Sequence, residues 1–396
     1  MSTVHVLLVE PDYYTRFPPL GLLKLAAYHK MKNDTVELVR GCRLPKGNPQ
    51  RIYVTSLFTY TWKPVHQAVR YFKELYPTIE VWLGGIYASL MPEHAQLSGA
   101  DRIWTGLFDD AEDLMPDYSL VPEWDASIIF ASRGCIRNCA FCAVPKLEGR
   151  PNRLRYHIEQ LVYPGHKRII LWDNNILGNP NWRPIFDELI ELGLKVDFNQ
   201  GLDARLISDE SAEGISKMKT EYIRLAYDTL KVGPYVENAI NVLSQHGIRK
   251  KKIIVYTLFN FDDDPKDFFQ RVKHILNWGS ASYPMRFQPL DSLNKNEYVG
   301  PNWTREELDK VQRARRVLGC SGAFPPYDAL IVKFNKAKSF DEAFSLRPPR
   351  SGDFMYECVP RLLGSAYKRE RGAREKVRVR WVQERDWRKV AGTSKT

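Results

Sequence analysis

The segment SIIFASRGCIRNCAFC, residues 127–142, decides how the rest of the chain is interpreted. Residues 127–131 are mostly apolar and predict a short buried strand. A loop with three cysteines in the pattern C-x3-C-x2-C follows that strand at once. In parallel barrels and sheets, ligands bind in the loops that follow the carboxyl ends of the strands. We therefore expect residues 132–142 to carry the functional site of a parallel α/β domain.

The three cysteines of this loop, Cys135, Cys139 and Cys142, are candidate metal ligands. Thiolates are soft ligands that suit zinc or an iron–sulfur cluster. A structural zinc site needs four protein ligands, and the nearest further candidate outside the loop is His157. Three thiolates on a four-iron cluster would leave one iron free to bind a small molecule. The ligand count therefore favours a catalytic cluster over a structural site.

The residues after the loop repeat a strand–helix rhythm whose spacing is typical of a parallel barrel. Amphipathic helices, such as residues 182–192 and 235–245, lie between most of the predicted strands. For residues 121–300 we predict a partial (β/α)6 TIM-type barrel, with a single larger open sheet as the alternative. The predicted strands are residues 127–131, 168–172, 195–199, 222–227, 253–259 and 285–289.

Residues 1–120 also alternate strands with helices and predict an α/β, doubly wound parallel sheet. A linker is expected near residue 120. Residues 301–396 predict a small α-rich extension, which opens with a capping box formed by Thr304 and Glu307. Predicted strands of the first part are residues 4–9, 35–39, 52–57 and 79–83; predicted helices are 20–29 and 65–75; the expected ligand loops are 10–19, 58–63 and 84–89.

The composition excludes several classes of protein. Of 396 residues, 44% are hydrophobic and 27% are charged, which is ordinary globular usage and excludes a disordered or collagen-like chain. Six cysteines are too few for a secreted disulfide scaffold. The sequence shows no secretory signal and no run near the roughly 18 apolar residues of a membrane span. We expect a cytoplasmic protein with no membrane partner.

The formal net charge is +11, and much of it lies in residues 368–396, which hold eleven Lys or Arg against four Asp or Glu. One interpretation of this tail is a nucleic-acid contact, in which Trp381 and Trp387 stack on bases. The other is a solvated, partly disordered terminus.

The cysteine pattern resembles the signature of radical S-adenosylmethionine (SAM) enzymes, including an aromatic residue, Phe141, before the last cysteine. The resemblance covers roughly residues 125–300. The first part resembles the cobalamin-binding-type domain that precedes the barrel in one branch of that family; the matching pieces are PPLGLL at 18–23 and GGIYAS at 84–89. The Asp-x-His-x-x-Gly motif that ligates cobalt is absent from residues 1–120, so cobalamin stays an open question.

This resemblance implies that the three cysteines hold a 4Fe–4S cluster whose fourth iron is chelated by SAM. One electron, from a reductant protein such as flavodoxin or ferredoxin, would split SAM into methionine and a 5′-deoxyadenosyl radical that takes hydrogen from the substrate. The implied reaction is a methyl or methylthio transfer, or a related modification, on an unknown substrate. The alternatives are a tRNA- or DNA-modifying radical enzyme that docks through the basic tail, and a non-catalytic iron–sulfur or zinc protein.

Polar residues after the barrel strands are the other candidate cofactor contacts. Asp173, Asn174 and Asn175 follow the second strand, where the family contacts the SAM amino group; an Asx turn is the alternative. Gln200 and Arg205 follow the third strand and suit a ribose or a carboxylate. Arg205 has a second interpretation, in which it pairs only with Asp203 or Asp209.

Asp228 follows the fourth strand, from which the family often reaches the SAM ribose; a helix N-cap is the alternative. The segment around Gln288 is expected to offer backbone groups to adenine. We reject a metal site at residues 262–264, because acidic residues before a proline-started helix are a common capping arrangement. Cys42, Cys320 and Cys358 are expected to be inert thiols, although an auxiliary cluster at the last two is an alternative.

Overall fold

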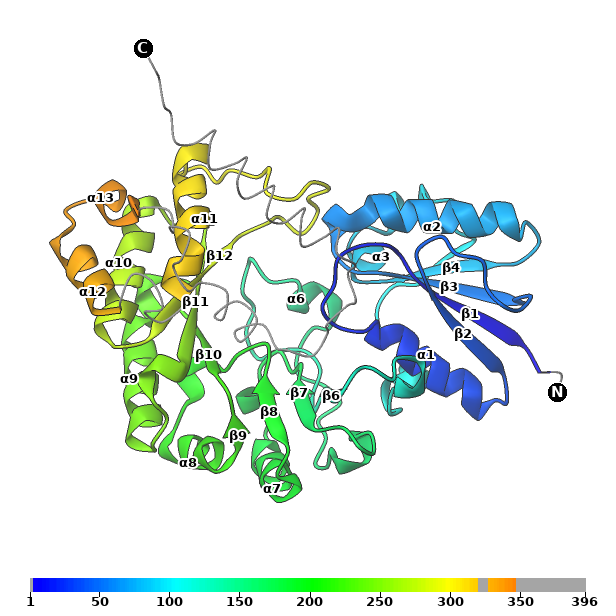
Figure 1. The fold of residues 1–396 in the computed structure, drawn as a ribbon, viewed down its shortest axis with the longest axis horizontal. Coiled ribbons are helices and arrows are strands. Elements are labelled where there is room, and N and C mark those ends of the chain that lie inside the picture. Colours follow the sequence, from blue (N-terminus) through cyan, green and yellow to red (C-terminus); the bar gives the residue numbers. More distant parts are fainter. Residues whose placement is uncertain (1–2, 320–326, 347–396) are drawn as a thin grey trace, which may run out of the picture.

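The computed structural model describes residues 3–319 and 327–346, in a five-stranded sheet, a partial barrel and a group of C-terminal helices (Figure 1). The predictions for Cys320, Cys358 and the basic tail at 368–396 lie outside the described residues. None of the described helices has the length and apolar character that crossing a membrane requires.

The N-terminal part is a doubly wound parallel sheet, as predicted, with strand order β2-β1-β3-β4-β5. Alternate residues of β1 face opposite sides. Leu7 belongs to the core beneath α2, whereas Leu8 belongs to the core beneath α1. The elements are β1 (His5–Glu10), α1 (Leu20–Met31), β2 (Thr35–Arg40), β3 (Arg51–Ser56), α2 (Trp62–Leu75), β4 (Val81–Gly85), α3 (Ile86–Leu90), α4 (Pro92–Gln96), β5 (Arg102–Ile103) and α5 (Asp109–Glu112).

The second part is an open, partial barrel of parallel strands, which confirms the predicted fold class. Its two sheets, β6-β7-β8-β9 and β10-β11-β12, are joined by a parallel bridge between Leu202 and Leu225. The elements are β6 (Ala126–Ile129), α6 (Val144–Leu147), β7 (Arg168–Leu171), α7 (Trp182–Leu192), β8 (Lys195–Phe198), α8 (Asp209–Lys217), β9 (Lys219–Thr220), β10 (Ile223–Ala226), α9 (Gly233–Gln245), β11 (Ile253–Phe259), α10 (Pro265–Asn277) and β12 (Ala281–Arg286).

One predicted strand is misplaced. Residues 285–289 were expected to form the last barrel strand, but β12 occupies Ala281–Arg286 and contains Pro284. Proline lacks the N–H that a central strand needs, so it argues against a strand at this position. In the structure β12 lies at the edge of its sheet and pairs only with β11, and an edge strand tolerates proline.

The C-terminal helices are α11 (Arg305–Gly319), α12 (Tyr327–Lys336) and α13 (Phe340–Phe344). They share an apolar core with α10, in which Phe268 and Phe334 are fully buried. The predicted capping box is present, because the Glu307 N–H donates to Thr304 Oγ1 at 3.3 Å and the Thr304 N–H donates to Glu307 Oε2 at 2.8 Å.

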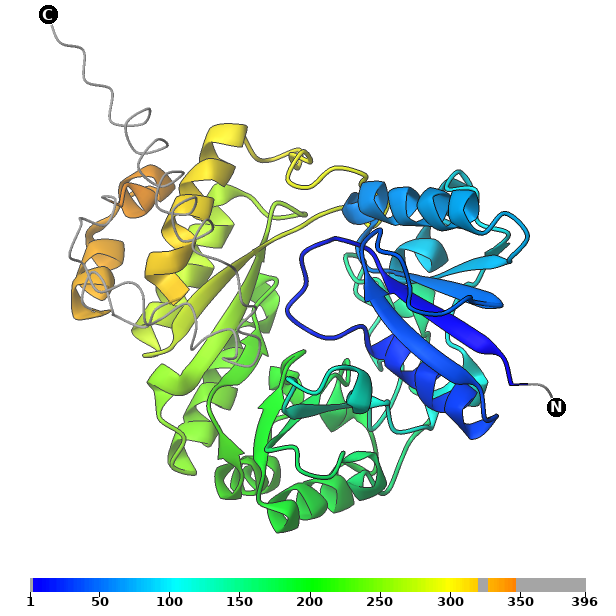
Figure 2. The same cartoon turned by 45° about the vertical axis from the view of Figure 1, so that its right-hand side comes forward.

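The chain near residue 120, where a linker is expected, is packed against both parts. Val121 and Trp124 share a core with Leu23 of α1 and Ile170 of β7. The loop after β1 also reaches the barrel (Figure 2), where the Phe17 ring lies 5.0 Å from the Trp172 ring. The N-terminal sheet and the barrel therefore pack directly on each other, with the carboxyl edge of the sheet turned toward the barrel.

Candidate functional site

The cysteine loop, defined here as residues 130–152, closes on itself directly after β6. Arg133 and Asn152 exchange backbone hydrogen bonds of 3.0 and 2.9 Å, and the Cys135 N–H donates to the Gly149 carbonyl at 3.1 Å. Gly134 has a φ of +75°, and a Cβ there would lie 2.2 Å from the Arg150 carbonyl oxygen. Only glycine fits this close approach, so the residue before the first cysteine is needed to close the loop.

The three loop cysteines are partly exposed and form no disulfide. Burial raises the pKa of the Cys139 thiol, and Cys142 and Asp228 raise it further, against an opposing effect of Arg205. Burial also raises the pKa of Cys142. Metal binding would therefore release protons from these thiols. Within residues 3–319 and 327–346, no three His, Cys, Asp or Glu side chains form a ready-made metal site, but a donor set of soft sulfur alone fits an iron–sulfur cluster.

Asp173 is buried and directed at the start of the cysteine loop. Its carboxylate accepts hydrogen bonds from the Ala131 N–H at 2.9 Å, the Ser132 N–H at 2.6 Å and the Ser132 hydroxyl at 2.8 Å. Burial raises the pKa of Asp173 to about 6, against the effect of these donors. The donors belong to the segment after β6, so the alternative of a local Asx turn does not apply. Asp173 orders the loop start.

Glu148 holds the loop from its far end, a role that the sequence analysis missed. Its carboxylate accepts from the Gly134 N–H at 2.8 Å, from Asn174 Nδ2 at 3.0 Å and from Arg133 Nη1 at 3.3 Å. The one available signal was a glutamate next to a glycine shortly after the last cysteine. That signal is weak, because the partners of Glu148 depend on how the loop returns.

Asp203 gathers side chains from three elements. Its carboxylate accepts from Arg137 Nε in the cysteine loop at 2.8 Å, from Arg205 Nε at 2.7 Å and from Asn175 Nδ2 at 3.3 Å. Burial favours a higher pKa for Asp203, but the guanidinium groups of Arg205 and Arg137 outweigh it and hold the pKa below its usual value. Of the two partners considered for Arg205, Asp203 and Asp209, the structure pairs it with Asp203.

Asp228 lies just after β10, where burial raises its pKa to about 6 against the effects of Arg271 and Arg205. It interacts electrostatically with Cys139 and Cys142. The helix N-cap alternative is wrong, because the N-cap of α9 is Val232. The structure thus brings Asp228 and Arg205 to the cysteines.

The remaining predicted residues differ in how they are placed. Asn175 is buried after β7, and its Oδ1 has no hydrogen-bond partner among the described residues. Gln200 is exposed after β8. Gln288 bonds to Asn296, with its Oε1 accepting from the Asn296 N–H at 3.1 Å.

An aromatic row leads from the cysteine loop to the segment after β12. Phe141 meets Phe261 edge-on at 5.7 Å, Phe261 meets Phe287 at 4.7 Å, and Phe287 meets Tyr298 at 5.5 Å. Phe141 thus packs on the barrel wall, which anchors the loop beside its last cysteine.

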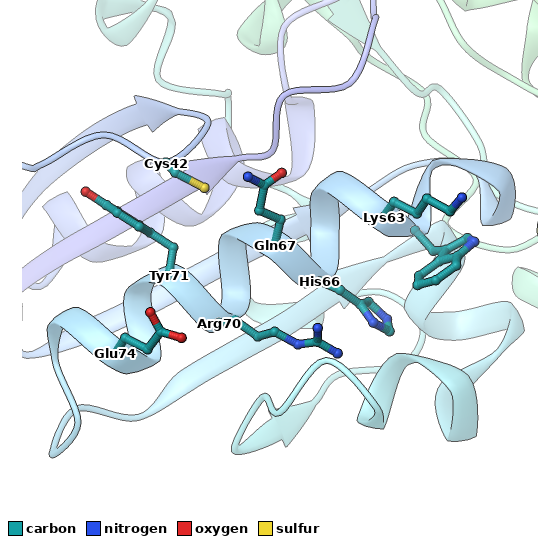
Figure 3. A pocket seen from close by; sticks show the side chains of 8 residues that line it. Cys42, Lys63, His66, Gln67, Arg70, Tyr71 and Glu74 are labelled. Carbon is teal, nitrogen blue, oxygen red and sulfur yellow. The ribbon is translucent and has the colours of Figure 1, made fainter.

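A hollow of about 460 Å³ lies elsewhere, over α2 (Figure 3). Cys42, His66, Gln67 and Arg70 are among the residues that line it. None of its lining residues belongs to the cysteine loop or to the strand ends described above, so it is separate from the candidate site.

Comparisons with known proteins found partial similarity to two enzymes. No protein-family model matches the chain. The ribosomal protein uS12 methylthiotransferase RimO of Petrotoga mobilis is 29% identical over 126 residues, covering 29% of this chain and 28% of RimO. The bacteriochlorophyllide d C-12(1)-methyltransferase of Chlorobaculum tepidum is 26% identical over 184 residues, covering 40% of this chain and 38% of that enzyme. The chain thus matches well under half the length of either relative.

Two solved structures share the fold. Both are of TsrM, a radical S-adenosylmethionine methyltransferase from Kitasatospora setae. One, with tryptophan substrate and a SAM analogue bound, has a TM-score of 0.56 at 14% identity and covers 72% of this chain and 73% of TsrM. The other, with cobalamin and a [4Fe-4S] cluster bound, has a TM-score of 0.53 at 14% identity, with coverage of 72% and 75%.

Proposed function

We propose that this chain, which belongs to the radical SAM superfamily, cleaves S-adenosylmethionine reductively at its cysteine loop. The observation that carries the proposal is the position of that loop. Three free thiols, Cys135, Cys139 and Cys142, follow the first strand of a partial barrel that has the fold of a radical SAM methyltransferase. Ligand loops of parallel barrels lie at this end of the strands.

The cysteines would hold the cluster, and their surroundings would hold SAM. When bound, a 4Fe–4S cluster supplies the single electron that splits SAM into methionine and a 5′-deoxyadenosyl radical. We assign the SAM ammonium to Asn175, because its buried Oδ1 is an acceptor without a partner among the described residues. With its carboxylate taken up by the loop, Asp173 would act on SAM only through the loop geometry.

The ribose and adenine contacts remain predictions. Asp228 stands beside the cysteines and, ionised above its pKa of about 6, would accept hydrogen bonds from ribose hydroxyls. Arg205 is fixed by Asp203 and would present the rest of its guanidinium group to the SAM carboxylate. Gln200 and the backbone around Gln288 would complete the SAM site.

The transferred group is proposed from the relatives. RimO is named a methylthiotransferase, and the Chlorobaculum tepidum enzyme and TsrM are named methyltransferases. We propose a methyl or methylthio transfer, or a related modification, on a substrate that these matches do not identify. The reductant would be a flavodoxin- or ferredoxin-type protein, in the reducing environment of the cytoplasm.

Cobalamin is a proposed second cofactor at the carboxyl edge of the N-terminal sheet. This edge faces the cysteine loop, because α3 contacts α6. The four histidines of residues 3–120 are hydrogen-bonded to other side chains, which fits cobalamin only without a histidine ligand to cobalt. Gly85 lends no support, because a Cβ there would lie 2.2 Å from the Ser56 carbonyl oxygen, so strand packing explains this glycine.

The first experiment needs no substrate. The protein is reconstituted with iron and sulfide without oxygen, reduced with dithionite and mixed with SAM, and 5′-deoxyadenosine is measured by mass spectrometry. We expect the product from the wild type and from Cys42→Ala, a cysteine outside the loop, but not from Cys139→Ala. S-adenosylhomocysteine is measured alongside, because donation of the SAM methyl group leaves it behind. Product formation by Cys139→Ala, or zinc as the bound metal, would refute the proposal.

Nucleic acid is a proposed partner only through residues 368–396, on the strength of their charge. Contacts between Lys or Arg and phosphates weaken steeply as salt rises. RNA and DNA binding should therefore fall between 50 and 200 mM salt, roughly in proportion to the number of contacts, and disappear when residues 368–396 are deleted. Binding that survives the deletion would locate the contact elsewhere.

A further inference from the structure

A buried chain of alternating charges joins the N-terminal part to the cysteine loop. Lys24 Nζ on α1 lies 3.0 Å from Glu112 Oε1 and donates to the Glu112 carbonyl at 2.7 Å. Arg133 Nε, in the cysteine loop, donates to the same Glu112 Oε1 at 2.6 Å. All three side chains are buried. Glu112, on α5, is therefore shared between the two parts of the molecule.

The chain continues from Arg133 into the loop itself. Arg133 Nη1 contacts Glu148 Oε1 at 3.3 Å, and the other Glu148 oxygen accepts from the Gly134 N–H. The Arg133 guanidinium also lies 3.3 Å from the centre of the Phe130 ring. Arg133 thus contacts Phe130, which precedes it in the loop. Through Glu148 it also holds Gly134, the residue before the first cysteine.

Outer ion pairs reach the same helix but are weaker. Arg153 and Arg155 pair with Asp109 and Asp113, whose side chains are exposed. Exposed pairs contribute little, whereas a buried charge that loses its partner is costly. Among the described acidic residues at α5, we therefore expect only the loss of Glu112 to change the order of the loop.

We propose that Glu112 is a positioning residue, through which the N-terminal part holds the cysteine loop in the shape that retains the cluster. Glu112 acts through Arg133 and does not itself touch the cysteines. The inference rests on the proposed function only where iron serves as the readout, because loop order is measurable without iron. In this proposal the N-terminal part supports the metal site through the loop, without contributing a ligand.

The test compares the anaerobically reconstituted wild type with Glu112→Gln and with Asp110→Asn, which changes an exposed acid on the same helix. Iron release to a ferrous chelator is timed. We expect Glu112→Gln to release iron about 10–100-fold faster, the range seen when partners of metal ligands are removed, and Asp110→Asn to match the wild type. Release from Glu112→Gln at the wild-type rate would overturn the proposal.

A double variant separates positioning from simple charge balance. Lys24→Met combined with Glu112→Gln removes one cation and one anion together, so Arg133 keeps Glu148 as its counter-ion. We expect thermal unfolding to return toward the wild type while iron release stays fast. If iron release also returns to the wild-type rate, Glu112 serves only to neutralise Lys24 and the positioning role is refuted.

Failure of the proposed function would be recognised separately. In that case the wild type itself would bind no cluster. Hydrogen–deuterium exchange of the iron-free proteins then tests the positioning role of Glu112. Glu112→Gln should raise exchange in residues 130–152, and Asp110→Asn should not. Equal exchange in all three proteins would overturn the inference.

Discussion

Three carboxylates hold the cysteine loop from different sides. Asp173 binds the Ser132 N–H at its start, Glu148 binds the Gly134 N–H, and Asp203 binds the Arg137 side chain between the first two cysteines. A carboxylate accepts several hydrogen bonds at once, so it can order a loop that lacks regular backbone pairing. At the scale of single residues, these three carboxylates hold the loop in shape and are not left free to bind a ligand.

A second cluster of side chains predicts a pH effect. Tyr87 is buried between His66 and His94, at 2.8 and 2.5 Å, and burial lowers the pKa of His66 to about 4. The unfolded chain takes up a proton near pH 6.5 that native His66 does not, so the free energy of unfolding falls as pH drops from 6.5 toward 4. Urea unfolding should lose about 2 kcal/mol more between pH 7 and 5 in the wild type than in His66→Gln. A wild-type slope in His66→Gln would contradict the assignment.

At the scale of elements, the sequence predicted what depends on local chemistry. The Thr304–Glu307 capping box and the alternating strands and helices of the first 120 residues follow from short-range rules, and both are present. The two-residue strand β5 and the edge strand β12 were missed or misplaced, because their pairing depends on distant partners. Glu148 was missed for the same reason, since its carboxylate meets partners on both sides of the loop.

Mutations in the acidic residues before α10, 262–264, test whether they cap the helix and do not bind a metal. The Asp264 side chain accepts from the Asp267 N–H at 2.7 Å, Asp263 pairs with the fully buried Arg271, and Asp262 is exposed. The loss of free energy of unfolding on mutation to alanine should therefore be about 3–5 kcal/mol for Asp263, about 1 kcal/mol for Asp264 and under about 0.5 kcal/mol for Asp262. Urea unfolding gives this order. A rise in wild-type stability on adding calcium or magnesium would instead indicate a metal site here.

At the scale of the whole molecule, the two α/β parts share a core. Leu23 of α1, in the first part, packs with Trp124 and Ile170 of the second. Composition predicted a linker near residue 120, because prolines and acidic residues cluster there. Composition cannot show that the apolar residues between them are buried. The same packing turns the carboxyl edge of the N-terminal sheet toward the cysteine loop, an arrangement that no local pattern contains.

This shared core predicts that truncating a side chain of the N-terminal part at the core will loosen the start of the cysteine loop. Leu23 and Val69 are both fully buried in the N-terminal part, but Leu23 faces the barrel, whereas Val69 lies in the core beneath α2. Truncating either side chain to alanine should cost about 2–5 kcal/mol through the cavity it leaves. Hydrogen–deuterium exchange should then rise in residues 126–135 for Leu23→Ala but not for Val69→Ala. Equal protection of residues 126–135 in both variants would show that the shared core around Leu23 does not order the loop. The contribution of the N-terminal part would then reduce to the Glu112 contact.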